Sequence, residues 1–235
     1  MHPFLGEFIG TAILIILGEG VVANVVLHKT KGNNSGWIVI TFGWAIAVFT
    51  GIFVASHFRK AHLNPAFTLA AAYIGNGFGW ADVPAYIGGQ VLGAMTGALI
   101  VWLAYKLHFM ATPDADLKLA VFCTSPAIRN TPNNLITEMI GTFMLVFAAL
   151  YIAAPASTLG ALDALPVALV VLGVGLSLGG PTGYAINPAR DLGPRIMHAL
   201  LPIPGKRDSD WGYAWIPVLG PIVGGMLAGV LYKLL

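Results

Sequence analysis

The sequence predicts an all-α membrane protein in which six transmembrane helices and two half-helices form an inverted repeat. Three observations predict this fold: a composition poor in charge, apolar stretches of membrane-spanning length, and an N-P-A tripeptide that occurs once in each half. Of the 235 residues, 57% are hydrophobic and 9% are charged, and the mean hydropathy is +0.80. Soluble domains carry about 25% charged residues. The composition therefore indicates a chain that exposes much of its surface to lipid.

Composition also excludes several classes of function. The net charge of +2 is small and scattered, so we expect no nucleic-acid partner. The single cysteine, Cys123, excludes an internal disulfide and a cysteine-based metal site. No nucleophile–base pair or metal cluster is evident, so we expect neither an enzyme nor a cofactor. The first apolar run lacks a basic flank and a cleavage site, which favours a retained span over a signal peptide.

The apolar stretches can be compared with the ~20 residues that a helix needs to cross hydrocarbon. Six predicted spans result: 4–27, 36–56, 83–106, 134–154, 163–180 and 212–234. Polar or Pro/Gly-containing connections are predicted at 28–35, 107–133, 155–162 and 200–211. Two shorter segments, about 65–76 and 188–199, are too short to span, and each follows the asparagine of an N-P-A tripeptide.

The two tripeptides are helix-start signals placed inside membrane-like sequence. They are Asn64-Pro65-Ala66 and Asn187-Pro188-Ala189. Asparagine is a good N-cap, and proline fits the first helical position because its missing N–H costs nothing there. Each half-helix would direct its positive N-terminal end into the membrane interior. Each asparagine amide would be free to donate into a lumen, which favours a solute with an oxygen lone pair over a cation.

The halves of the chain match each other. Glu7 to Thr11 resembles Glu138 to Thr142 at an offset of 138 − 7 = 131, and the two N-P-A asparagines are separated by 187 − 64 = 123. Because three spans per copy is an odd number, the second copy must be inserted upside down. The sequence thus predicts one domain over 1–235, with a first repeat at about 1–110 and a second at about 132–235.

The paired N-P-A tripeptides, the N-P-A-R-D extension at 187–191 and the repeated Glu-x-x-Gly-Thr resemble the major intrinsic protein family along essentially the whole chain. This family comprises the aquaporins and aquaglyceroporins. The resemblance implies an aquaporin-like fold and a passive channel in the lipid bilayer of the cell membrane. It further implies a homotetramer whose subunits each conduct, with both termini cytoplasmic.

The same resemblance places four selectivity-filter residues on this chain: Trp44, Gly175, Tyr184 and Arg190. A guanidinium in a membrane segment is costly and marks a functional site, and its forked donors suit two neighbouring hydroxyls. Glycerol facilitators have Trp and Gly where this chain has Trp44 and Gly175, whereas water-selective members tend to have Phe and His. Gly175 would leave space for the ring of Tyr184, and this ring with Trp44 would form an apolar corner for the carbon side of a polyol.

Tyr184 departs from the usual Phe, and its hydroxyl would add a polar group and slight bulk at the constriction. Slower glycerol passage and better accommodation of hydroxy acids and water both remain open. The expected permeants are small and uncharged: glycerol, dihydroxyacetone, urea, hydrogen peroxide, protonated lactic acid and water.

Four further residues are expected to support the pore structure. The resemblance implies that Glu7 and Glu138 accept backbone N–H groups of the N-P-A loops, and that His62 lines the cytoplasmic approach. Asp191 lies one helical turn before Arg195, so the two could pair.

Two other classes of protein compete with this interpretation. A water-selective aquaporin is disfavoured by Trp44 and Gly175. An ion-coupled secondary transporter can also use inverted repeats and broken helices, but it needs ion-coordinating acids near its site. Glu19 is the acid in a predicted span to which we assign no function, and packing, a lumen position or a subunit contact all remain open for it.

The distribution of cations opposes the implied topology. Predicted inner segments carry Arg59, Lys60 and Lys233, whereas predicted outer segments carry Lys29, Lys31, Lys118, Arg129, Lys206 and Arg207. Cytoplasmic connections normally hold the excess of Lys and Arg. We retain the family orientation because the motifs are more specific than this bias.

Overall fold

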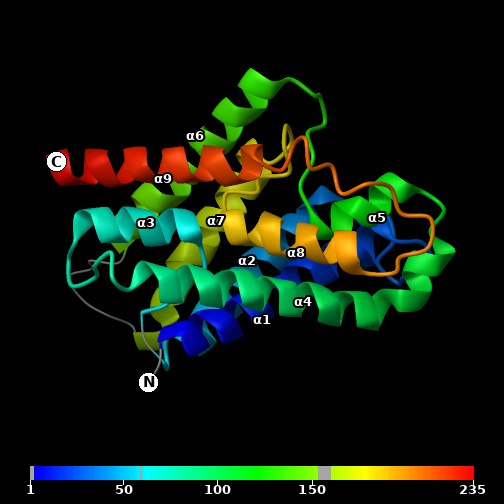
Figure 1. Ribbon diagram of the computed structural model, residues 1–235, viewed down its shortest axis with the longest axis horizontal. Coiled ribbons are helices and arrows are strands. Elements are labelled where there is room, and N and C mark those ends of the chain that lie inside the picture. Colours follow the sequence, from blue (N-terminus) through cyan, green and yellow to red (C-terminus); the bar gives the residue numbers. More distant parts are fainter. Residues whose placement is uncertain (1–2, 59, 153–159) are drawn as a thin grey trace.

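The computed structural model describes residues 3–58, 60–152 and 160–235, and in these ranges the chain forms helices and no strands. The helices are α1 (Pro3–Val26), α2 (Trp37–Ala55), α3 (Pro65–Ile74), α4 (Val83–Ala111), α5 (Ala115–Phe122), α6 (Thr131–Ile152), α7 (Ala164–Leu178), α8 (Pro188–Leu200) and α9 (Ile216–Leu234). Figure 1 shows α3, α4, α8 and α9 running roughly along the longest axis, with both chain termini toward one end. The all-α prediction is confirmed.

Five helices are long and apolar enough to cross a membrane: α1, α2, α4, α6 and α9. The remaining predicted span, 163–180, is a shorter helix, α7, which follows a 3₁₀ turn over Gly160–Asp163. Along α2, Ile38, Phe42 and Ile46 follow each other at four-residue spacing and are each at least half exposed. Such a stripe suits a surface that faces lipid.

The two repeats interlock through their half-helices. Helix α3 packs against α9 of the second repeat, and α8 packs against α4 of the first. The most extensive packing joins α1 to α4 in the first repeat and the equivalent pair, α6 and α9, in the second. Gly93 and Gly224 occupy equivalent places there, because a Cβ on either would overlap the backbone of Phe8 or Met139. Small residues of this kind let membrane helices approach closely.

Observed helix boundaries differ from the prediction mainly between the third and fourth spans. The predicted connection 107–133 contains the unpredicted helix α5, and α4 continues to Ala111. Asp114 starts α5 by accepting the N–H groups of Asp116 and Leu117. Residues 153–154 of the fourth predicted span, 155–159 of the next connection, and Arg59 lie outside the described residues.

Candidate functional site

The two half-helices meet N-terminus to N-terminus, and the asparagines join them. In each loop the asparagine Oδ1 accepts the N–H two residues later, as an N-cap should. The Asn64 Nδ2 donates to the Ile186 carbonyl at 2.8 Å, and the Asn187 Nδ2 donates to the Leu63 carbonyl at 2.7 Å. One amide hydrogen of each asparagine is therefore used across the junction. The prediction that both amides are free to donate into a lumen needs correction, because one N–H remains for that purpose on each.

The loop before α3 is held by Glu7 of α1. Its carboxylate accepts the backbone N–H groups of His62 at 2.7 Å and Leu63 at 2.8 Å. Gln90 of α4 donates to the same carboxylate at 2.7 Å and to Thr68 of α3 at 2.9 Å. Leu63 has φ = 52°, a left-handed conformation that is strained for leucine. The carboxylate therefore stabilises a strained turn that points the Leu63 carbonyl at Asn187.

The loop before α8 is held in the same manner by Glu138 of α6. This carboxylate accepts the N–H groups of Ala185 at 3.0 Å and Ile186 at 2.9 Å, and the hydroxyl of Thr182 at 2.7 Å. Ile186 has φ = 44°, the counterpart of the turn at Leu63. Both acidic side chains are almost fully buried and fully used by these bonds. The contacts implied for Glu7 and Glu138 are present.

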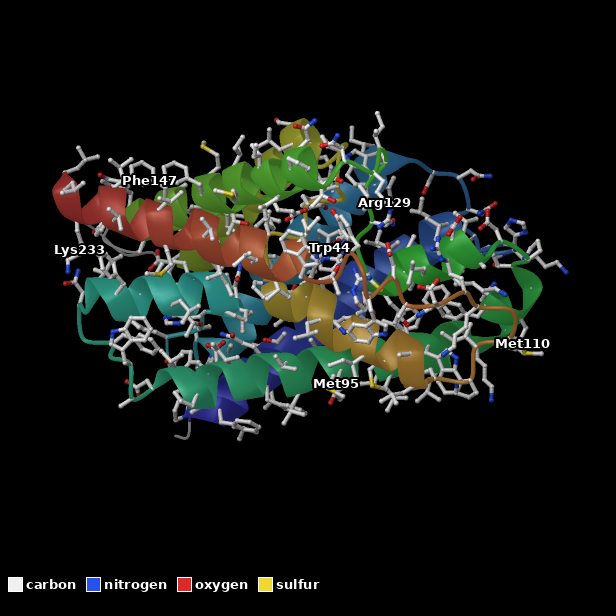
Figure 2. All side chains as sticks on the ribbon, turned by 45° about the horizontal axis from the view of Figure 1, so that its top comes forward. Trp44, Met95, Met110, Arg129, Phe147 and Lys233 are labelled. Atoms are coloured by element: carbon white, nitrogen blue, oxygen red, sulfur yellow. The ribbon has the colours of Figure 1, made fainter. Side chains whose placement is uncertain are left out.

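A cavity of about 470 Å³ runs along this junction, and its wall is mainly apolar. Its lining includes the following polar and charged residues: Ser56, Lys60, His62, Asn64, Asn187 and Arg190. Figure 2 shows Trp44, which also lines the cavity, near the middle of the bundle, between Lys233 at one end and Met110 at the other. Of the predicted filter and N-P-A residues, this cavity is lined by Trp44, Asn64, Tyr184, Asn187 and Arg190. Gly175 and the proline and alanine of each tripeptide are not among its lining residues.

His62 also lines the cavity and is surrounded by aromatic rings. The centroids of Phe67, Phe78 and Tyr86 lie 5.0, 4.7 and 4.7 Å from its imidazole. Its Nδ1 lies 3.2 Å from the Thr68 hydroxyl. Through Thr68 the imidazole joins the hydrogen bonds around Gln90, so its orientation is fixed by the same network that holds the loop.

Arg190 also lines the cavity and is placed by two elements. Its guanidinium carbon stacks 4.2 Å from the centroid of the Trp44 ring on α2. Its Nη1 donates a long 3.5 Å hydrogen bond to the carbonyl of Phe122, the last residue of α5. In the described ranges it makes no ion pair with a carboxylate. Most of its donors are therefore available to a solute.

Tyr184 also lines the cavity, and Gly175 lies against its ring. A Cβ at Gly175 would lie 2.9 Å from Cζ of Tyr184, so the ring occupies the space that the glycine leaves, as predicted. We call Trp44, Gly175, Tyr184 and Arg190 the aromatic–arginine cluster. The Tyr184 oxygen is buried and has no hydrogen-bond partner among the described residues. The effect of this hydroxyl on the choice of solute stays a prediction.

The predicted pair of Asp191 and Arg195 forms behind Arg190. Arg195 Nε lies 2.7 Å from Asp191 Oδ1, and both side chains are fully buried. Thr124 donates its N–H and its hydroxyl to the same carboxylate at 2.8 and 2.6 Å. Arg195 also donates to the carbonyls of Ser209 and Thr124. This network ties the half-helix to the segments that follow α5 and α8.

Several supporting residues were not predicted from the sequence: Thr68, Gln90, Thr124, Thr182 and Trp37. At the offset of 131 residues that relates the two repeats, the counterpart of Gln90 is Pro221, so internal symmetry gave no signal for it. Thr68 follows Asn64 by one helical turn, and this spacing could have indicated it.

Cations near the α5 end of the bundle make contacts within the protein. The groups concerned are Lys118, Arg129, Lys206 and Arg207. Arg129 binds Asp210 at 2.5 Å, and this hydrogen bond raises the pKa of its guanidinium. Arg207 pairs with Asp116, which raises its pKa in the same way. These cations are therefore engaged in local structure.

A helical bundle of membrane-spanning length, with two half-helices that meet beside a central cavity, defines a membrane channel protein. The cavity is lined by both asparagines and by a guanidinium together with the aromatic residues Trp44 and Tyr184. No group of three or more His, Cys, Asp or Glu residues that could hold a metal ion occurs in the described part of the chain.

Comparison with known proteins gives the family. The model of the major intrinsic protein family matches residues 1–232. A probable glycerol uptake facilitator protein of Thermotoga maritima is 57% identical over 233 residues, covering 99% of each chain. A D/L-lactic acid transporter of Lactiplantibacillus plantarum is 40% identical, covering 97% of this chain and 95% of the relative. The aquaglyceroporin structure from Plasmodium falciparum has a TM-score of 0.87 at 32% identity, covering 99% and 95%. The chain belongs to the major intrinsic protein family and is an integral membrane protein.

Proposed function

We propose that the protein is a passive channel for glycerol and other small uncharged solutes. The observation that carries this proposal is the aromatic–arginine cluster, in which the Arg190 guanidinium stacks on Trp44 and faces the same cavity as Tyr184. A guanidinium can donate to two neighbouring hydroxyls. The aromatic rings offer an apolar surface to the carbon side of the same molecule. The cluster therefore suits an amphipathic polyol, and the glycerol facilitators among the relatives support this choice.

Electrostatics favour neutral solutes. Two positive half-helix ends converge at the asparagines, and Arg190 has no carboxylate partner in the described ranges. A cation entering the cavity would be repelled at both places. The same passage would suit dihydroxyacetone, urea, hydrogen peroxide and water. The relative named a D/L-lactic acid transporter supports adding protonated lactic acid to this set.

The proposal includes a homotetramer in the cell membrane with both termini in the cytoplasm. The four engaged cations described above offer a physical reason for the unusual charge bias of the outer connections. Lys206, for example, donates to the carbonyls of His198, Ala199 and Leu201 at the C-terminal end of α8. A cation that caps a helix end or pairs with an acid is weak evidence for the orientation of the chain in the membrane.

Stopped-flow measurements on proteoliposomes test the proposal. Glycerol, urea and lactic acid at acidic pH should each equilibrate faster than in protein-free vesicles, with a flux that is linear in the solute gradient. Imposed proton or sodium gradients should leave the glycerol flux unchanged. Water flux without glycerol flux would support a water-selective channel instead, and a sodium- or proton-driven flux would support a coupled transporter.

Gly175→Ala gives a matched test of the site. The added Cβ would force the Tyr184 ring to move, so glycerol permeability should fall more than water permeability. Gly173→Ala is the control on the same helix, because a Cβ there has no neighbour within 4 Å. Equal effects of the two substitutions would contradict the assignment of this site.

A further inference from the structure

Trp37, the first residue of α2, contacts the aromatic–arginine cluster without belonging to it. Its indole Nε1–H donates to the Gly175 carbonyl at 3.0 Å. Its ring meets the ring of Tyr184 edge-on, with centroids 5.7 Å apart and planes at 79°. The indole does not line the cavity, so its effect on a solute must act through these two residues.

The Tyr184 ring is held by packing rather than by polar contacts. Its hydroxyl has no hydrogen-bond partner in the described chain, so nothing of that kind fixes the far end of the ring. Its backbone has φ = 39°, which is strained for a tyrosine and does not by itself favour one ring position. Neighbouring side chains must therefore determine where the ring lies.

Two glycines of α7 and its C-terminus bring these neighbours close. A Cβ at Gly179 would lie 2.6 Å from Cδ1 of Tyr184 and 2.7 Å from Cζ2 of Trp37. A Cβ at Gly175 would lie 2.9 Å from Cζ of Tyr184 and 3.0 Å from Cγ2 of Thr41. The tyrosine ring thus fills a slot with α7 on one side and Trp37 at its edge. Loss of the indole would open the slot at the edge of the ring that Trp37 contacts.

We propose that Trp37 is a positioning residue that sets the size limit of the channel by holding Tyr184 opposite Arg190. This inference rests on the proposed function, and it assigns discrimination between three-carbon and longer polyols to the contact of Trp37 with Tyr184. Edge-to-face aromatic pairs contribute roughly 1 kcal/mol beyond area burial, which corresponds to about a fivefold change in an equilibrium constant.

The test measures erythritol, glycerol and water permeability in proteoliposomes. Trp37→Ala should raise the ratio of erythritol to glycerol permeability by about threefold to fivefold, the range that one aromatic contact can supply. Trp37→Phe, which keeps a smaller ring but loses the N–H, should give an intermediate ratio and serves if the alanine variant does not fold. Trp80→Ala is the control, because Trp80 is 57% exposed in the connection between α3 and α4; its ratio should equal that of wild type.

A double-mutant cycle separates positioning from a general structural effect. In a Tyr184→Ala background, Trp37→Ala should leave the permeability ratio unchanged, because the ring on which it acts is gone. Equal loss of all three fluxes in the single variant, or the same shift of the ratio without Tyr184, would overturn the inference while leaving the proposed function intact. Wild-type vesicles that pass no glycerol would instead overturn the proposed function, and this inference with it.

Discussion

The loops before α3 and α8 share one design at their tips. Each places a non-glycine residue in a left-handed conformation, Leu63 or Ile186. Each sends the carbonyl of that residue to the asparagine of the other loop. Each rests its backbone N–H groups on one buried carboxylate, Glu7 or Glu138. Where the half-helices touch, the repeats are equivalent.

Three and four residues after the asparagine the loops diverge. The first loop has Phe67 and Thr68 there, and the second has Arg190 and Asp191. Thr68 joins a network of neutral groups with Gln90, whereas Asp191 joins the buried ion pair described above. At the position three residues after the asparagine, the passage is therefore lined by the phenyl ring of Phe67 in the first loop and by the guanidinium of Arg190 in the second.

This difference separates two tasks that a symmetric pore could not perform together. The equivalent tips position the half-helices, and any substitution there should affect both repeats alike. The divergent positions supply the chemistry, so selectivity should depend on the second loop. The predictions below test this division, from the largest expected effect to the smallest.

The largest effect should follow from Arg195→Met. This variant leaves Asp191 charged in a fully buried site without its ion-pair partner, which costs about 3–5 kcal/mol. The second loop should lose its anchor, and little folded protein should remain in a detergent thermal-unfolding assay. Arg207→Met is the control: its exposed pair with Asp116 should contribute less than about 1 kcal/mol. Equal melting temperatures for the two variants would contradict the importance of the buried pair.

The next effect concerns the equivalent tips. Glu7→Gln and Glu138→Gln each replace a carboxylate acceptor by an amide that presents N–H groups to backbone N–H groups. Hydrogen bonds to a charged group contribute about 1.5–3 kcal/mol, so each variant should lose about this much stability. The two losses, measured by chemical or thermal unfolding, should agree closely. A loss in one repeat alone would show that the tips are not energetically equivalent.

These comparisons also show which features the sequence could reveal. The spans were predictable from their length and the half-helices from their capping residues, because both are local signals. Glu7 and Glu138, which hold the loop tips, stood out because they repeat between the halves. Helix α5 was missed because eight residues between two spans give little periodicity, although Asp114 is a good N-cap. Because α5 was not predicted, Phe122 at its end was not predicted either, although its carbonyl accepts a hydrogen bond from Arg190.

Contacts that depend on tertiary structure could not be predicted. Trp37, at the start of a span and 41% exposed, has the pattern of an ordinary interfacial anchor. Its contacts with Gly175 and Tyr184 arise only when α2 and α7 pack together. The direction of the Tyr184 hydroxyl likewise depends on the packing around it.

A smaller effect on stability, but a clear one on selectivity, should follow from Arg190→Met. The guanidinium makes one long hydrogen bond and one stacking contact, so the loss of stability should be about 1 kcal/mol. Glycerol permeability should fall because the donors are lost, and proton leakage, read with an entrapped pH dye, should rise because the positive charge is lost. Phe67→Met, at the equivalent place in the first loop, should leave proton leakage at the wild-type level. Similar leakage in the two variants would refute the division of tasks between the loops.

The smallest effect should have the opposite sign. Glu19 of α1 is fully buried like Glu7, but neither of its oxygens has a hydrogen-bond partner in the described ranges. Replacing it by methionine keeps the length of the side chain and removes a polar group whose burial is unfavourable. Glu19→Met should therefore gain about 1 kcal/mol in the free energy of unfolding, since an unsatisfied buried polar group costs at least that much. Glu7→Met, which loses three hydrogen bonds, should be destabilised in the same assay. Destabilisation of both variants to the same extent would show that the Glu19 carboxyl stabilises the fold despite its lack of partners.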